Sequence, residues 1–139
     1  MIACAPGVLD LIAEQARHEA PNECCGLLIG SGGRIDRAVP LRNRAADPLC
    51  RYEIDPRDFL AALKQCRGTG DAVVGAYHSH PRSSVEPSES DRAEAFGDFL
   101  YLIAGPVAND VPLRIEAFRL ENGNFRRVGL VPEPKEPEP

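Results

Sequence analysis

Several features that would define a class of protein are missing from this chain of 139 residues. No apolar run approaches the roughly 20 residues that a membrane-spanning helix needs. The first six residues lack the basic and long apolar stretches of a secretory signal peptide. The formal net charge is −5 and no basic patch stands out, which argues against nucleic acid as a partner. We therefore expect a soluble protein that binds neither nucleic acid nor membrane.

A disulfide framework is missing as well. The chain has five cysteines, an odd number, and no two of them have C-x-x-C spacing. This pattern fits reduced thiols in a cytoplasmic protein, and most such cysteines are small buried apolar residues. The chain has the length of one domain and no internal repeat. The sequence therefore predicts a single cytoplasmic domain.

Apolar periodicity indicates the order of helices and strands. Helical spacing predicts helices over residues 6–20, from Asp55 to Gly68 or Gly70, and from Ser88 to about Phe96. In the second helix, Leu60, Leu63 and Cys66 are expected to face inward. Alternating or continuous apolar runs predict strands over residues 25–29, 34–41, 49–54, 72–77, 99–104, 113–120 and 125–130. The sequence thus predicts an α/β fold, a single domain with a mixed β-sheet flanked by helices.

The C-terminal residues differ in composition from the rest of the chain. Residues 131–139 are rich in proline and glutamate and contain few apolar side chains. Such a segment buries too little apolar surface to become ordered. We expect one domain over residues 1–130 and a disordered tail over residues 131–139.

Two histidines close the apolar strand that begins at Ala72. Residues two apart on a strand point to the same face, so the imidazoles of His78 and His80 can converge. Seven residues separate His80 from Ser88, and Asp91 follows three positions after Ser88. Two imidazoles and one carboxylate form a ligand set that suits zinc with one position left open, as in catalytic sites.

Each part of this pattern also has an ordinary interpretation. An H-x-H pair on a strand is more often a core or surface feature, and Glu23 alone is an ordinary surface acid. Ser88 and Asp91 have the spacing of a helix capping box. These interpretations weaken in combination because His78 and His80 end a buried strand and Asp91 opens the next helix. Strand ends that face helix starts are where α/β proteins build their sites.

The stretch His78-Ser79-His80-Pro81, with Ser88 and Asp91, resembles the H-[ST]-H-P-x(6)-S-x-x-D signature of the JAMM (MPN+) zinc metalloproteases. The segment Pro21-Asn22-Glu23-Cys24-Cys25-Gly26-Leu27-Leu28 is similar to the one that carries the glutamate of this family. The likeness runs from the first helix through Ile103. It implies the MPN layout, a mixed sheet with helices like that of cytidine deaminases, in its stand-alone prokaryotic form.

The resemblance implies a role for each matched residue. His78, His80 and Asp91 would hold one Zn²⁺ per chain, with a water in the fourth position whose pKa the metal lowers to about 7. Glu23 would be the general base, and Ser88 would donate a hydrogen bond to the oxyanion. Motifs of nucleobase deaminases and of G-x-S-x-G hydrolases are absent.

The two cysteines after Glu23 could suggest a thiol nucleophile or additional zinc ligands. Because the metal already has three ligands, we interpret Cys24 and Cys25 as buried strand residues.

The resemblance also implies a substrate class. The family cuts peptide or isopeptide bonds after the Gly-Gly end of ubiquitin-like or sulfur carrier proteins, in some members releasing an added cysteine. We expect a metallopeptidase that acts on such a carrier protein, with the loops 43–50 and 82–85 as contact candidates. The alternative is a non-catalytic MPN scaffold that binds a ubiquitin-like partner. The sequence leaves the oligomeric state, a homodimer included, open.

Overall fold

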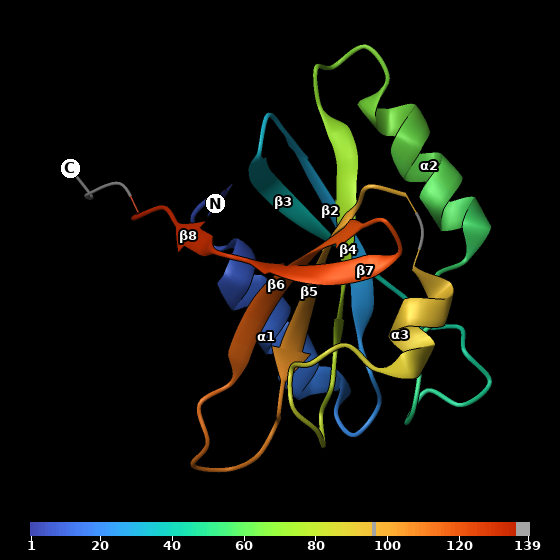
Figure 1. Cartoon of the computed structure of the whole chain (residues 1–139), viewed down its shortest axis with the longest axis vertical. Coiled ribbons are helices and arrows are strands. Elements are labelled where there is room, and N and C mark those ends of the chain that lie inside the picture. Colours follow the sequence, from blue (N-terminus) through green and yellow to red (C-terminus); the bar gives the residue numbers. More distant parts are fainter. Residues whose placement is uncertain (96, 136–139) are drawn as a thin grey trace.

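The structure is a computed structural model that describes residues 1–95 and 97–135. Eight strands form one mixed sheet in the order β7-β6-β5-β4-β2-β3-β1-β8 (Figure 1). The helices are α1 (Val8–Glu19), α2 (Pro56–Cys66) and α3 (Glu89–Glu94). The strands are β1 (Ile2–Cys4), β2 (Cys25–Ser31), β3 (Arg34–Leu41), β4 (Ala72–Ser79), β5 (Leu100–Gly105), β6 (Arg114–Glu121), β7 (Asn124–Val128) and β8 (Leu130–Pro132).

Two apolar cores cover opposite faces of the sheet. Neighbouring residues of β2 alternate between them, since Leu28 packs in one core and Leu27 and Ile29 pack in the other. The first core includes the buried face of α1, and the second includes Ala62 and Cys66 of α2. Figure 1 shows α1 and α2 on different sides of the strands. The predicted α/β fold with a mixed sheet flanked by helices is therefore confirmed.

The interior strands agree well with the sequence pattern. β3 has the predicted bounds and forms the expected antiparallel hairpin with β2. β5 is buried along its whole length and runs parallel to β4. The turn at Asn122 and Gly123 joins β6 to β7, as predicted. These elements place the C-terminal end of β4 in the middle of the sheet.

Helix α2 begins where the sequence predicts, but two of the side chains that were expected to be buried are exposed. The side chain of Asp55 caps it by accepting a hydrogen bond from the Arg57 amide at 2.9 Å. The prediction that Leu60 and Leu63 face inward was wrong, since these side chains are 54% and 40% exposed. The sheet contacts only one side of α2, where Ala62 and Cys66 are buried, so the apolar stripe is wider than the surface that covers it.

The predicted strand over residues 49–54 was wrong, because this segment is an irregular loop. The reason lies in its hydrogen bonds. The Glu53 amide donates to the side-chain oxygen of Asn43, and the Arg51 carbonyl accepts from the side-chain nitrogen of the same residue, both at 3.0 Å. Backbone groups that bond to a side chain are not free to pair with a neighbouring strand.

The ends of the described chain add two short strands that the sequence did not indicate. β1 pairs in parallel with both β3 and β8, and Arg34 forms an ion pair with Glu133 at 2.7 Å. β8 thus includes Val131 and Pro132, the first residues of the predicted tail, while residues 136–139 lie outside the described residues. The domain boundary at residue 130 stays a prediction. Each strand has only three residues, too few for a periodic pattern.

Helix α3 starts after Ser88, as predicted, and ends at Glu94, whereas the predicted end at Phe96 lies outside the described residues. Four of the five cysteines are buried and all five are free. Within residues 1–95 and 97–135, no helix is long and apolar enough to cross a membrane.

Candidate metal centre

The C-terminal end of β4 carries both histidines into the protein interior. His78 belongs to β4, and the amide of His80 extends the sheet by donating to the Ala104 carbonyl at 2.8 Å. Gly105 lies against the His80 carbonyl so closely that a Cβ atom would overlap with it. The side chains of His78 and His80 are 1% and 5% exposed. Their Nε2 atoms lie 3.1 Å apart, so the predicted convergence of the two imidazoles is confirmed.

Asp91 reaches the histidines from the first turn of α3. The Ser88 hydroxyl accepts from the Asp91 amide at 3.0 Å, and the Ser88 amide donates to Asp91 Oδ2 at 2.8 Å, which completes a capping box. The cap holds the carboxylate so that Oδ1 lies 3.0 Å from His78 Nε2 and Oδ2 lies 3.0 Å from His80 Nε2. The helix cap and the proposed ligand are therefore one structural unit.

The spacing and chemistry of these atoms fit a metal cation. A tetrahedral zinc with bonds of about 2.0–2.1 Å separates its ligand atoms by about 3.3 Å, close to the 3.0 and 3.1 Å seen here. His80 Nδ1 lies 2.7 Å from the Ser84 carbonyl, which requires a proton on that nitrogen. In the neutral ring Nε2 then has a lone pair that faces the Asp91 carboxylate, an arrangement that needs a cation or a proton between the two groups.

The ionisation of the three groups follows from burial and mutual contact. Burial lowers the pKa of His78. Burial also acts to lower the pKa of His80, but its contacts with Asp91 and Ser84 outweigh that effect and raise the pKa. Burial would raise the pKa of Asp91, yet hydrogen bonds from the two histidines hold it well below its usual range. Asp91 is therefore the anionic member of the group.

Glu23 approaches the histidines from the start of β2. It is 7% exposed, and its ligand oxygen lies within 4.8 Å of the nitrogens of His78 and His80. Burial raises its pKa to about 7. Among the described residues its Oε1 atom has no hydrogen-bond partner, although buried carboxylates seldom lack one. A bound water or a metal would supply the missing partner.

Either carboxylate could be the third ligand beside His78 and His80, because both converge on them. Asp91 has direct contacts of 3.0 Å with both rings, whereas the described residues show no hydrogen bond between Glu23 and either histidine. This difference favours Asp91 as the ligand, with the Glu23 oxygen within 4.8 Å of both histidine nitrogens.

Ser79 connects the two strands that carry these residues. Its hydroxyl accepts a hydrogen bond from the Cys24 amide at 2.8 Å, and its own amide donates to the Cys24 carbonyl at 3.1 Å. Burial raises the pKa of Cys24 to about 11 and that of Cys25 to about 12, so both remain neutral thiols. Both cysteines are buried, as expected; Cys25 begins β2, whereas Cys24 lies immediately before the strand.

Tyr52 is a site residue that sequence reasoning missed. Its ring stacks on the imidazole of His78 with centroids 4.3 Å apart and an interplanar angle of 19°. His78 Nδ1 has no hydrogen-bond partner among the described residues, so the Tyr52 ring is the contact that restrains this imidazole on its outer side. A single tyrosine in an irregular segment gives no periodic signal. Only the fold reveals it.

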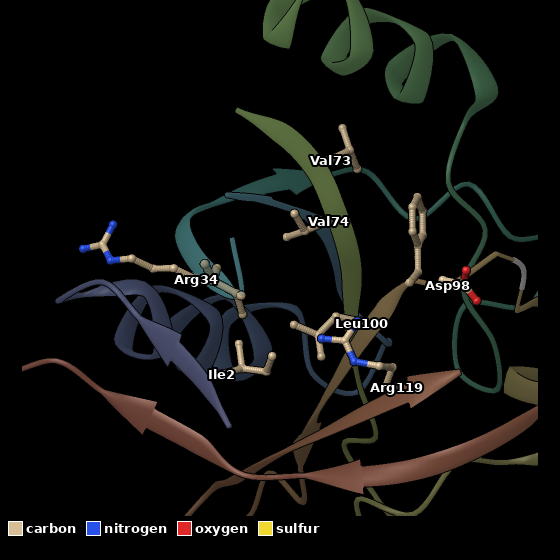
Figure 2. Close-up of a pocket in the computed structure, with 10 residues that line it drawn as sticks. Ile2, Arg34, Val73, Val74, Asp98, Leu100 and Arg119 are labelled. Atoms are coloured by element: carbon tan, nitrogen blue, oxygen red, sulfur yellow. The ribbon is translucent and has the colours of Figure 1, made fainter. Parts of the chain in front are cut away.

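An apolar groove of about 390 Å³ leads away from this tyrosine. It lies between the sheet, α2 and α3, and its lining includes Tyr52, Phe59, Leu60, Glu94 and Tyr101. A separate hollow of about 300 Å³ is lined by residues such as Ile2, Arg34, Leu100 and Arg119 (Figure 2). None of the proposed metal ligands lines either hollow, and the groove adjoins His78 through Tyr52, whose ring lines the groove and stacks on this imidazole.

Comparison with known proteins places these features in a family. The family model "Prokaryotic homologs of the JAB domain" matches residues 5–121. A desampylase from Haloferax volcanii is 34% identical, with 91% of this chain and 89% of the relative covered. A probable TtuB-protein conjugate cleaving protease from Thermus thermophilus is 36% identical, with 90% and 78% covered.

A solved structure agrees with these matches. The solution structure of a protein from Desulfitobacterium hafniense superimposes with a TM-score of 0.84 at 29% identity, covering 97% of this chain and 94% of that one. The chain therefore belongs to the prokaryotic JAB-domain family, and it is a peptidase of the JAMM type.

Proposed function

We propose that this protein is a zinc-dependent metallopeptidase that hydrolyses the bond after the C-terminal Gly-Gly of a ubiquitin-like or sulfur carrier protein. The observation that carries the proposal is the convergence of two buried imidazoles, a buried anionic carboxylate and a second buried carboxylate whose Oε1 atom has no partner among the described residues. Zinc bound by His78, His80 and Asp91 would polarise a water and the scissile carbonyl.

Glu23 is positioned to move the proton. A carboxylate with a pKa of about 7 accepts a proton from water at neutral pH and can return it to the leaving amine. Its Oε1 atom has no other partner in the described part of the chain, so nothing competes for that role. Glu23 is therefore our candidate for the general base and acid.

Ser88 can serve both the helix and the reaction. Its hydroxyl oxygen accepts from the Asp91 amide, which leaves the hydroxyl proton for another acceptor. A hydrogen bond from that hydroxyl to the oxyanion of the tetrahedral intermediate would stabilise the transition state by about 3 kcal/mol. We assign this role to Ser88 because its backbone and hydroxyl already hold the proposed ligand Asp91.

The substrate class is supported by the names of the relatives and by the groove. One relative is a desampylase and another is named for cleaving TtuB-protein conjugates. We assign to the groove an apolar residue that precedes the two glycines, because Leu60 lines it and it extends to Tyr52, the ring that stacks on His78. Release of an added cysteine is one reaction of this kind.

Cleavage of a carrier fusion tests the proposal. We expect about one zinc per chain, cleavage after Gly-Gly that a chelator abolishes and zinc restores, and loss of cleavage with retained zinc in Glu23→Gln. The exposed acid Glu89 of α3 provides a matched control, since Glu89→Gln should cleave like the unchanged protein. A metal-free protein that binds the carrier equally well with and without Glu23 would instead identify a non-catalytic scaffold.

A further inference from the structure

We propose that Asn43 is a positioning residue that holds the general base Glu23 and the ring of Tyr52 in one framework around the metal ligands. The inference rests on the proposed peptidase function and adds a residue that acts through Glu23 and Tyr52. It concerns the 43–54 loop, the irregular segment of residues 43–54 that joins β3 to α2.

All the hydrogen-bonding capacity of the Asn43 amide is used. Its Nδ2 atom donates to the carbonyls of Glu23 and Arg51, each at 3.0 Å. Its Oδ1 atom accepts from the amides of Ala45 and Glu53, each at 3.0 Å. Two carbonyls face the nitrogen and two amides face the oxygen, which fixes the orientation of the side chain. This half-buried side chain therefore closes the 43–54 loop together with the Arg44 amide, which donates to the Glu53 carbonyl at 3.0 Å.

Two of these bonds bracket Tyr52. The Arg51 carbonyl and the Glu53 amide belong to the residues immediately before and after it, so Asn43 holds the backbone on both sides of the tyrosine. The ring of Tyr52 in turn stacks on His78 at 4.3 Å. Asn43 thereby sets the place from which the ring restrains this ligand.

A third hydrogen bond of Asn43 holds the backbone of Glu23. Asn43 Nδ2 donates to the Glu23 carbonyl, and the Glu23 amide donates to the Pro48 carbonyl at 2.8 Å. Both backbone groups of Glu23 are thus held by the 43–54 loop, which Asn43 closes. The carboxylate itself has an unpartnered Oε1 atom, so its position depends on this backbone. A shift of about 1 Å in a catalytic group can cost about a hundredfold in rate.

Few residues could replace Asn43. Aspartate has the same shape and keeps the two acceptor contacts but cannot donate to the carbonyls of Glu23 and Arg51. Alanine removes all four bonds. Arg57 offers the matched control, since Arg57→Ala removes an exposed ion pair with Asp55 just beyond this loop and leaves the bonds of Asn43 in place.

The first test is kinetic. Asn43→Asp and Asn43→Ala should each lower kcat about 10- to 100-fold with KM changed less than threefold, while Arg57→Ala stays within twofold of the unchanged protein. In the Glu23→Gln background, Asn43→Asp should lower the residual rate by a smaller factor, because the part of its effect that passes through the base is already lost. An Asn43→Asp protein with full activity, or one equally impaired in both backgrounds, would overturn the proposal.

The second test uses hydrogen exchange in the metal-free chain and does not depend on activity. Asn43→Ala should speed exchange of the Ala45 and Glu53 amides, which lose their acceptor, and also of the Glu23 amide, whose partner Pro48 lies in the loop. Unchanged protection at Glu23 would show a purely local role and contradict the inference. Absence of cleavage by the unchanged protein would count against the proposed function instead. The hydrogen-exchange measurement would still test whether Asn43 holds the backbone of Glu23.

Discussion

The two halves of the candidate site are built in different ways. His78, His80 and Asp91 come from the end of β4 and the first turn of α3, where regular geometry and a capping box fix each side chain. Glu23 lies two residues before β2, and Tyr52 lies in an irregular loop that is closed by hydrogen bonds of Asn43 and Arg44. The metal-binding half, formed by His78, His80 and Asp91, is thus held by secondary structure. The base half, formed by Glu23 and Tyr52, is held by individual hydrogen bonds of a loop. Substitutions in the metal-binding half should abolish zinc binding and cleavage, and substitutions in the loop of the base half should only reduce them.

Asp91→Asn should have the largest effect. It keeps the size of the side chain but removes the anionic charge that faces two imidazoles at 3.0 Å. We expect zinc affinity to fall by at least about a hundredfold, measured by competition with a chelator, and cleavage to fall to background.

Glu89→Gln is the control. Glu89 lies two residues before Asp91 in the same helix, and this variant should bind zinc normally. The opposite pattern, with zinc retained in Asp91→Asn and lost in Glu23→Gln, would identify Glu23 rather than Asp91 as the third ligand.

Ser88→Ala should have the second largest effect, and on two separate quantities. Loss of the oxyanion donor should lower kcat about 100- to 1000-fold. Loss of the helix cap should lower the free energy of unfolding by about 1 kcal/mol, measured by denaturant titration.

Ser88→Asp separates these effects, because aspartate can still cap α3 but has no proton to donate at neutral pH. It should restore stability without restoring kcat. Recovery of kcat in Ser88→Asp would show that the serine acts only through the helix.

The difference between the halves also explains what the sequence could predict. His78, His80, Ser88 and Asp91 occur at spacings that a strand and a helix cap translate directly into positions in space, so the convergence of the histidines and the capping box were predictable. Glu23 was found through its resemblance to a family segment. Nothing in the spacing of Asn43 or Tyr52 indicates that they meet near Glu23 and His78, because loop closure depends on contacts between distant residues.

The same reasoning applies to the fold. Buried strands and the start of α2 follow from local patterns, and both were predicted. The exposure of Leu60 and Leu63 was not, since which part of an apolar helix stripe is covered depends on where the sheet lies. Residues 49–54 have the composition of a strand but no neighbouring strand to pair with.

Tyr52→Ala tests the base half at its contact with the metal-binding half. Removing the ring takes away the stack on His78, worth about 0.5–1.5 kcal/mol for an aromatic pair. We therefore expect zinc affinity to fall about three- to tenfold, far less than for Asp91→Asn. Tyr52→Phe keeps the ring and should bind zinc like the unchanged protein. A large loss in Tyr52→Phe would mean that the hydroxyl, rather than the stack, supports the site.

Leu60→Ala should have the smallest effect, and only on substrate binding. Leu60 lines the groove beside Tyr52 and is 54% exposed, so its truncation should change the free energy of unfolding by less than about 0.5 kcal/mol. If an apolar residue of the carrier tail packs there, loss of about 1 kcal/mol of contact should raise KM about fivefold and leave kcat unchanged.

Leu63 provides a close control for this experiment. It lies on the same helix and is 40% exposed, but it does not line the groove. Leu63→Ala should therefore leave both KM and kcat unchanged, whereas a general requirement for apolar surface on α2 would make the two variants alike. If neither variant changes KM, the carrier tail binds elsewhere. A selective effect of Leu60 would place it in the groove, beside the half of the site that the 43–54 loop holds.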